Sequence, residues 1–291
     1  MTQLFDIAAF WPPENFGVLD HSNSSNANEA ELKAFRSDRL KLKSAVILDS
    51  TPMRDVILDW SDRKSETVID FQSEFRQCTP PWTNVFVTLR FNGTRKIEES
   101  GVHIITLTRE ETIEQFGFNV FLDRDQDIHT ICHCRPWIKF PGQLCAKTFL
   151  NGSLIFLDSK GQWIAGMSLD SKRVESASKT QIVMALFACQ LVNCRNIVVV
   201  ANHRKAALPR GKKNKAPRIT YHVLKIADSV SSSSEEREPS VVSKAKHVCR
   251  GNFAHYTKEN KLFGKYVGMF WRPMHIKGNA KHGIVGKEYT L

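Results

Sequence analysis

The fold class follows from a region that begins with the run Asn84-Val-Phe-Val-Thr-Leu-Arg-Phe91. Its β-branched and aromatic residues are typical of a strand, and the Asn-Gly pair behind it is a turn signal. Up to Leu169 the pattern repeats, with turn pairs at Asn151-Gly and Lys160-Gly, in the runs 102–107, 118–122, 153–157 and 163–167. Repeated short strands with tight turns indicate a largely antiparallel sheet.

Fewer helices than strands are predicted. Asn28 is a candidate N-cap for a helix over residues 29–43, which has acids in its first turn and bases in its last. Residues 45–48 either extend this helix or form a strand, and residues 178–193 predict a mostly buried helix that is apolar on more than one face. Further strands are expected at 196–200 and 218–226. The predicted class is α+β: a largely antiparallel sheet with a few helices and a basic, aromatic-rich C-terminal β unit.

Composition divides the chain into three segments. Residues 1–28 contain Trp11-Pro-Pro and a Ser/Asn-rich stretch, and we expect them to form an N-terminal arm on the surface. Residues 29–170 predict a mixed region, a helix followed by antiparallel β structure. Residues 171–291 predict a basic C-terminal α+β region with mobile loops at 203–217 and 229–243. The second loop, serine-rich and acidic, is either an insertion within one continuous domain, which we favour, or an interdomain linker.

The positive charge is concentrated in the last third of the chain. Residues 1–202 carry 22 basic and 24 acidic side chains, residues 203–218 seven basic and none acidic, and residues 243–291 ten basic and two acidic. Such a localised basic surface favours a nucleic-acid partner, or less often an acidic protein, over a merely solvated lysine-rich face. There is no apolar stretch of membrane-spanning length and no signal-peptide pattern at Met1. We therefore expect a cytoplasmic protein without a membrane partner.

The first basic segment suits contact with phosphates, which would give a salt-dependent and sequence-independent affinity. Its alternative is a flexible, solvated loop. The candidate nucleic-acid-binding residues of this segment are Arg204, Lys205, Arg210, Lys212, Lys213, Lys215 and Arg218.

The second basic segment interleaves aromatic and cationic side chains. The aromatic residues Tyr256, Phe263, Tyr266, Phe270 and Trp271 lie among Arg250, Lys258, Lys261, Lys265, Arg272 and Lys277. Single-strand and RNA binders stack such rings on unpaired bases while the cations hold phosphates, which makes RNA a better partner than DNA. The alternative is that the rings form the core of a small β unit. The candidate binding residues here are Arg250, Asn252, Tyr256, Trp271, Arg272 and Lys277.

Histidines in the same segment open a catalytic alternative. A metal-independent ribonuclease needs a base, an acid and a cation on the phosphorane. His247, His255, Arg250 and Lys277 are the candidates for these roles. Histidines that hydrogen-bond the backbone are the other interpretation.

Cysteine spacing does not predict a metal site. Cys132 and Cys134, with His129 nearby, are closer than the usual zinc pair, and no clear second pair of ligands follows. Buried thiols are the better interpretation, so neither a metal nor a cofactor is predicted. The run Asp123–Asp127 resembles a calcium loop only at its start and predicts a hairpin turn instead.

The C-terminal segment also resembles a family motif. The motif is His247-x-x-Arg-Gly-x-Phe-x-x-Tyr256, then Leu-Phe-Gly-Lys, Gly268-x-x-Trp271, His275-Ile-Lys-Gly278 and Gly-Lys-Glu-Tyr289. It is similar to the C-terminal motif of a family of uncharacterised phage, plasmid and bacterial proteins, H-x-x-R-G-H-F/W followed by W-x-x-x-x-x-R/K-G. Residues 191–197, the basic loop and residues 221–226 also match that pattern. The resemblance covers about the last hundred residues.

The resemblance implies a function in the control of messenger RNA translation. The family includes the anti-CRISPR inhibitor that blocks synthesis of the type V-A CRISPR nuclease during translation. A similar role implies a mobile-element or phage-type protein that binds RNA and lowers the expression of a target message, with a nascent polypeptide or the ribosome as a further partner. Asn252 stands where the family has His, and Asn cannot shuttle a proton at neutral pH. A protein-binding module for an acidic or nascent polypeptide remains the third hypothesis. The family motif would mark the residues His247, Arg250, Gly251, Phe253, Tyr256, Trp271, Lys277 and Gly278.

Overall fold

The described chain divides into two compact units. A computed structural model describes residues 3–10, 16–18, 37, 39–64, 80–91, 98–107, 118–124, 128–139, 145–148, 153–157, 163–168, 171–208, 216–227, 245–249, 251–273, 275–277 and 279–284. Unit 1 contains residues 1–193 and 199–225, and unit 2 contains residues 194–198 and 226–291. The division expected at residue 170 differs from this one, because the long helix after it packs on the sheet of unit 1.

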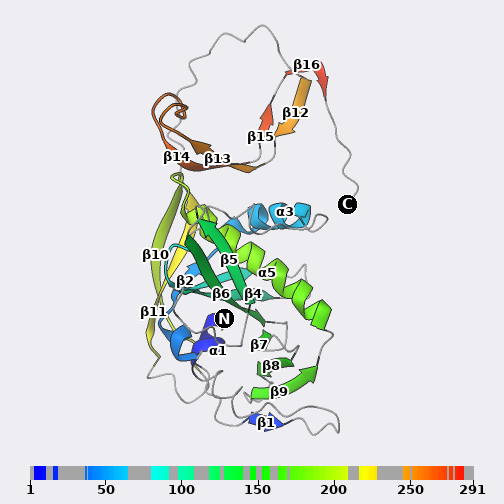
Figure 1. Cartoon of the computed structure of the whole chain (residues 1–291), viewed down its shortest axis with the longest axis vertical. Coiled ribbons are helices and arrows are strands. Elements are labelled where there is room, and N and C mark those ends of the chain that lie inside the picture. Colours follow the sequence, from blue (N-terminus) through cyan, green and yellow to red (C-terminus); the bar gives the residue numbers. More distant parts are fainter. Residues whose placement is uncertain are drawn as a thin grey trace. The chain divides into compact units, whose positions relative to one another are not determined.

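Unit 1 is built on an eleven-stranded sheet in which β1-β9-β8-β7-β6-β4-β3-β2-β11-β10 are neighbours and β5 pairs with β6 (Figure 1). The strands are β1 (Phe16–Val18), β2 (Val46–Asp49), β3 (Asn84–Arg90), β4 (Glu99–Leu107), β5 (Phe118–Arg124), β6 (Ile128–Lys139), β7 (Cys145–Thr148), β8 (Ser153–Leu157), β9 (Trp163–Ser168), β10 (Ile197–Lys205) and β11 (Arg218–Ile226). The α+β class and the C-terminal β unit are confirmed.

The strand pairing is largely antiparallel, as predicted. The chain of pairs β3-β4-β6-β7-β8-β9 is antiparallel throughout. Arg124 of β5 lies opposite Ile128 of β6, so the hairpin expected at residues 123–127 is confirmed. Among the described pairs of this sheet, β1 with β9, β2 with β3 and β2 with β11 are parallel. Residues 45–48 therefore lie mainly in a strand between two parallel neighbours and do not extend the helix before them.

Two helices cover opposite faces of this sheet. Helix α5 (Ser171–Val192) contacts β3, β4 and β6, and it is buried almost completely from Ser178 to Leu191, which confirms the predicted apolar helix. Val87 of β3 lines a cavity with Met184 of α5, whereas its neighbour Phe86 packs with helix α1 (Leu4–Phe10). Successive side chains of a strand point to opposite faces. A short 3₁₀ helix, η1 (Thr51–Met53), and helix α3 (Arg54–Lys64) follow β2. Neither helix was predicted from the sequence.

Helix α1 corrects the expected surface arm for residues 4–10. Leu4, Ile7 and Ala8 are fully buried in the main apolar cluster. A seven-residue helix is too short to be stable alone, so its ends depend on distant side chains. Its first N–H, on Leu4, donates to Glu99 at 2.8 Å, and the Arg39 guanidinium donates to the Ala8 carbonyl at 2.9 Å. The other residues of the expected arm that the structure describes, 16–18, form β1.

Glu99 is a buried carboxyl at the start of β4. Besides the bond from Leu4, it accepts a hydrogen bond from the Thr88 hydroxyl at 2.6 Å. Burial raises the pKa of Glu99 above its ordinary value, although these hydrogen bonds and the positive charges of Lys139 and Arg90 act in the opposite direction. The stability of unit 1 therefore depends on pH through the ionisation of Glu99.

We expect the substitution Glu99→Gln to remove this pH dependence. A carboxyl whose folded-state pKa is raised contributes stability below its unfolded pKa of about 4.3 and loses that contribution as the pH rises through the folded pKa. The free energy of unfolding of the wild type, relative to E99Q, should therefore fall as the pH rises above the unfolded pKa of about 4.3 in urea titrations. The glutamine side chain can still accept a hydrogen bond from the Leu4 N–H and donate one to the Thr88 hydroxyl. The Glu99→Ala variant loses both hydrogen bonds and should be less stable than the wild type at every pH. An offset between wild type and E99Q that does not change with pH would contradict the prediction.

Candidate nucleic-acid interface

Unit 2 consists of two small sheets. Strands β15 (His275–Lys277), β12 (Ala245–Cys249) and β16 (Asn279–Ile284) form a three-stranded sheet in that order. Strands β13 (Asn252–Tyr256) and β14 (Gly268–Arg272) form an antiparallel hairpin, whose loop is residues 257–267. The second basic segment of the sequence thus forms β structure, and most of its described side chains lie on the hairpin.

The hairpin is held together by aromatic packing. Phe253 and Trp271 are cross-strand partners with ring centroids 4.9 Å apart, and Tyr256 contacts Phe270 at 5.7 Å on the other face. Tyr256 is 7% exposed and Trp271 is 3% exposed. Both were predicted to stack on bases, and their burial corrects that prediction. They form the core of the hairpin, the alternative that the sequence had left open.

The outer edge of β14 is bound by the segment between α5 and β10. The Asn196 side chain donates to the Trp271 carbonyl at 2.6 Å and accepts from the Trp271 N–H at 2.9 Å. The Arg195 N–H adds a bond to the Met269 carbonyl at 2.9 Å. Asn196 thus satisfies the backbone of an edge strand as a neighbouring strand would. Sequence reasoning did not single out this residue, although it lies in the stretch 191–197 that matched the family pattern.

Gly251 of the Arg-Gly motif also serves the packing of the hairpin. A Cβ atom at this position would lie 2.6 Å from the Trp271 ring, so a larger residue would displace the indole. The glycine of the motif therefore has a steric reason that does not depend on a ligand.

The hairpin loop carries an exposed aromatic ring in a strained conformation. Phe263 has a φ of 52° and Gly264 a φ of 68°, and the Lys265 N–H donates to the Leu262 carbonyl at 3.1 Å. Two consecutive positive φ angles are typical of a type I′ turn, whose first central position favours Asn, Asp or Gly. Phenylalanine there stores about 1–3 kcal/mol of backbone strain. The residue is 81% exposed, and sequence reasoning had counted it only as one of the interleaved aromatics.

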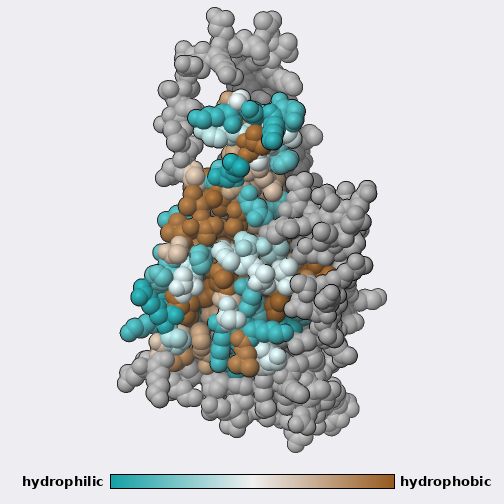
Figure 2. Space-filling model, turned by 60° about the vertical axis from the view of Figure 1, so that its left-hand side comes forward, coloured by the Kyte–Doolittle hydropathy of each residue, from teal (hydrophilic) through white to brown (hydrophobic). Residues whose placement is uncertain are grey.

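The same hairpin presents most of the exposed cations described in unit 2. Lys258, Lys261 and Lys265 are exposed in the loop, and Arg272 is exposed at the end of β14 with its guanidinium 5.2 Å from the centre of the Tyr256 ring. Figure 2 shows the hydrophilic residues of this loop in teal. Glu259 is the one acidic residue of the loop sequence, and a hydrogen bond with Thr257 lowers the pKa of its carboxyl. The loop is therefore a net positive surface that also carries two exposed aromatic residues, Phe263 and Tyr266.

The first basic segment is only partly a loop. Arg204 and Lys205 belong to β10, and Arg218 begins β11. Arg204 pairs with the fully buried Asp6 of α1 at 2.8 Å and is mostly covered, which makes it a packing residue of unit 1. Lys205 and Arg218 are exposed. The remaining candidates of this segment, Arg210, Lys212, Lys213 and Lys215, lie outside the described residues.

The structure places two of the four catalytic candidates on paired strands and a third, His255, on another strand. His247 of β12 and Lys277 of β15 are directly opposed in the antiparallel register. Asn252 and His255 lie instead on β13, exposed and opposite Arg272 and Met269. Arg250 lies outside the described residues.

The cysteines of β6 are buried thiols, as predicted. Cys132 and Cys134 lie near Cys189 of α5, and burial, reinforced by these two neighbours, raises the pKa of Cys189 well above its ordinary value. Burial also raises the pKa of Cys194 to about 12. Protonated, buried thiols are poor nucleophiles and metal ligands. Within the described ranges no three His, Cys, Asp or Glu side chains form a group suited to a metal ion, and the His129 side chain is outside them.

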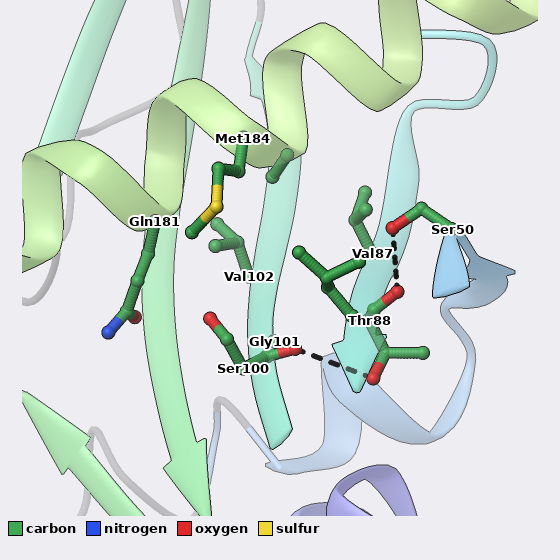
Figure 3. Close-up of a pocket in the computed structure, with 10 residues that line it drawn as sticks. Ser50, Val87, Thr88, Ser100, Gly101, Val102, Gln181 and Met184 are labelled. Atoms are coloured by element: carbon green, nitrogen blue, oxygen red, sulfur yellow. Dashed lines mark hydrogen bonds between the residues drawn. The ribbon is translucent and has the colours of Figure 1, made fainter. Parts of the chain in front are cut away.

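A small cavity between α5 and the sheet of unit 1 is too small for an organic ligand. Gln181 and Met184 of α5 face Val87, Ser100 and Val102 across it (Figure 3). The cavity has a volume of about 10 Å³, which is about what one water molecule requires.

Comparison with protein-family models, curated proteins and solved structures finds no match for this chain. Among the helices that the structure describes, none is long and apolar enough to cross a membrane.

We expect Asn196→Ala to loosen the hairpin without unfolding unit 1. The substitution leaves the N–H and carbonyl of Trp271 without their bonds to Asn196, at a cost of about 1–3 kcal/mol. Amide hydrogen exchange of residues 251–273 should become faster, while exchange in β3 and β4 stays the same. Unchanged protection at Trp271 would show that the side chain of Asn196 does not hold the strand.

Proposed function

We propose that this chain binds RNA through the basic surface of unit 2. The observation that carries the proposal is the β13–β14 hairpin, on which Lys258, Lys261, Lys265 and Arg272 are exposed around a buried aromatic core. Cations on a rigid scaffold can hold phosphates at defined positions, and the release of counterions then supplies most of the affinity.

The resemblance of the C-terminal motif extends the proposal to a biological role. We propose that the chain acts as a mobile-element or phage-type protein that lowers expression of a target message in the cytoplasm during translation. Gly251 and Trp271, two residues of the motif, pack against each other, and Asn196 beside them lies in the matching stretch. These positions support the hairpin on which the cations lie, which explains why they would recur in a family that uses this surface.

The affinity for a short single-stranded RNA should fall steeply with salt, and the hairpin lysines should account for part of that fall. Each phosphate contact with a single strand contributes about 0.7 to the slope of log K against log salt concentration. The double variant Lys261→Gln with Lys265→Gln should therefore lower the slope by up to about 1.4 in fluorescence-anisotropy titrations of the full chain.

The matched control is Lys43→Gln with Lys225→Gln, two exposed lysines of unit 1. This double variant makes the same change in net charge as the hairpin variant. If the hairpin makes the phosphate contacts, the control should leave the salt slope unchanged. Equal losses in both double variants would assign binding to the overall charge of the chain. A wild type that binds no RNA, but retains a protein partner after exhaustive nuclease treatment, would favour a module that captures an acidic or nascent polypeptide.

A metal-independent ribonuclease is the second candidate function, and the opposed positions of His247 and Lys277 favour it. A histidine and a lysine on neighbouring strands can supply a proton-transfer group and a cation for the phosphorane. Asn252 weighs against it, because the family His at this position would be the further acid or base.

Labelled RNA incubated with an excess of the full chain in EDTA should stay intact. Cleavage that is lost in His247→Ala and in Lys277→Ala, but retained in His203→Ala, would replace the binding proposal with the ribonuclease. His203 is a suitable control because it is exposed in unit 1 and its ring bonds only to Thr220 among the contacts described.

A further inference from the structure

Phe263 is the most exposed of the described aromatic residues of the hairpin. It is 81% exposed, whereas Tyr266 is 46%, Tyr256 is 7% and Trp271 is 3% exposed. A single exposed apolar residue is ordinary on a protein surface. Phe263 is unusual because its backbone is also unfavourable.

The turn itself would be more stable with another residue. Asn, Asp or Gly adopts the φ of 52° with little strain, and each would also remove the apolar ring from water. The sequence thus carries two local costs at one position and gains no packing there in return. Strain of this kind is retained where the side chain serves a function.

The charges around the ring indicate the chemistry of its partner. Lys261 and Lys265 flank Phe263 in the sequence, and Lys258 is exposed in the same loop. A planar apolar ring between cations suits a partner that offers a flat, weakly hydrated face between anionic groups. An unpaired nucleotide has this composition, since its base stacks on aromatic rings and its flanking phosphates bind lysine.

We propose that Phe263 stacks on an unpaired base of RNA while Lys261 and Lys265 hold the neighbouring phosphates. The inference rests on the proposed function and adds the class of RNA, a strand or loop with unpaired bases. A continuous duplex keeps its bases stacked on one another and offers Phe263 no free face.

The test compares the wild type with Phe263→Asn and Phe263→Trp, each as the full chain. The probes are a short oligouridylate and a blunt RNA duplex of the same length. Asn removes the ring but suits the backbone, so the thermal midpoint of unfolding should not fall. The affinity of F263N for the oligouridylate should fall about 5- to 100-fold, with the salt slope unchanged, because stacking on an aromatic ring contributes to affinity independently of charge. Phe263→Trp should retain the affinity, and the duplex should bind the three proteins equally.

Each alternative outcome has its own meaning. If the wild type binds neither RNA, the proposed function fails and this inference fails with it. If the wild type binds and F263N binds the oligouridylate equally well, the stacking role is overturned while RNA binding stands. Equal losses on oligouridylate and duplex would also overturn it. Loss of binding to anionic phospholipid vesicles in F263N, with RNA affinity intact, would assign the ring to a lipid surface, although one ring buries little apolar area for that purpose.

Discussion

The two hydrogen bonds between the Asn196 side chain and the backbone of Trp271 are the constraint on which the candidate interface depends. A two-stranded hairpin is marginally stable in water, because each strand leaves one edge without partners. Asn196 supplies those partners on the β14 side, and the Arg195 N–H adds a third bond at Met269. The segment between α5 and β10 thus acts as a partial third strand for the hairpin.

This arrangement separates the aromatic residues by role. Trp271, Phe253 and Tyr256 pack within the hairpin, and Gly251 leaves the space that the indole requires. With the strands held by these rings, the loop can carry a ring in a strained turn and several lysines without losing its shape. A side chain that is exposed and strained can contribute to binding in a way that a buried ring cannot, and this places the functional interest on the loop and not on the motif's tryptophan.

Sequence patterns predicted several strands of unit 1 and helix α5, but they did not predict β1, β6, β7, α1 or α3. Alternating or β-branched runs such as 84–90 and 218–226 are local signals, so the strands and their antiparallel hairpins could be recognised. The parallel pairs of β2 depend on contacts between segments far apart in the chain, which no local pattern encodes. Helix α1 was missed for a related reason. Its ends are satisfied by Glu99 and Arg39, about 95 and 31 residues away, while its own seven residues are too few to signal a stable helix.

The sequence by itself determined the α+β class, the apolar helix before β10, and the concentration of positive charge in the last third of the chain. It also showed that aromatic and cationic residues alternate in the segment that forms the hairpin. Only the tertiary structure decided which aromatic rings are buried and which are exposed, because a ring's accessibility depends on its strand register and on the groups packed against it. Tyr256 and Phe263 look alike in the sequence, but one lies under the Arg272 guanidinium in a paired strand and the other at the tip of a turn. That difference moves the proposed contact with RNA from the core of the motif to its loop.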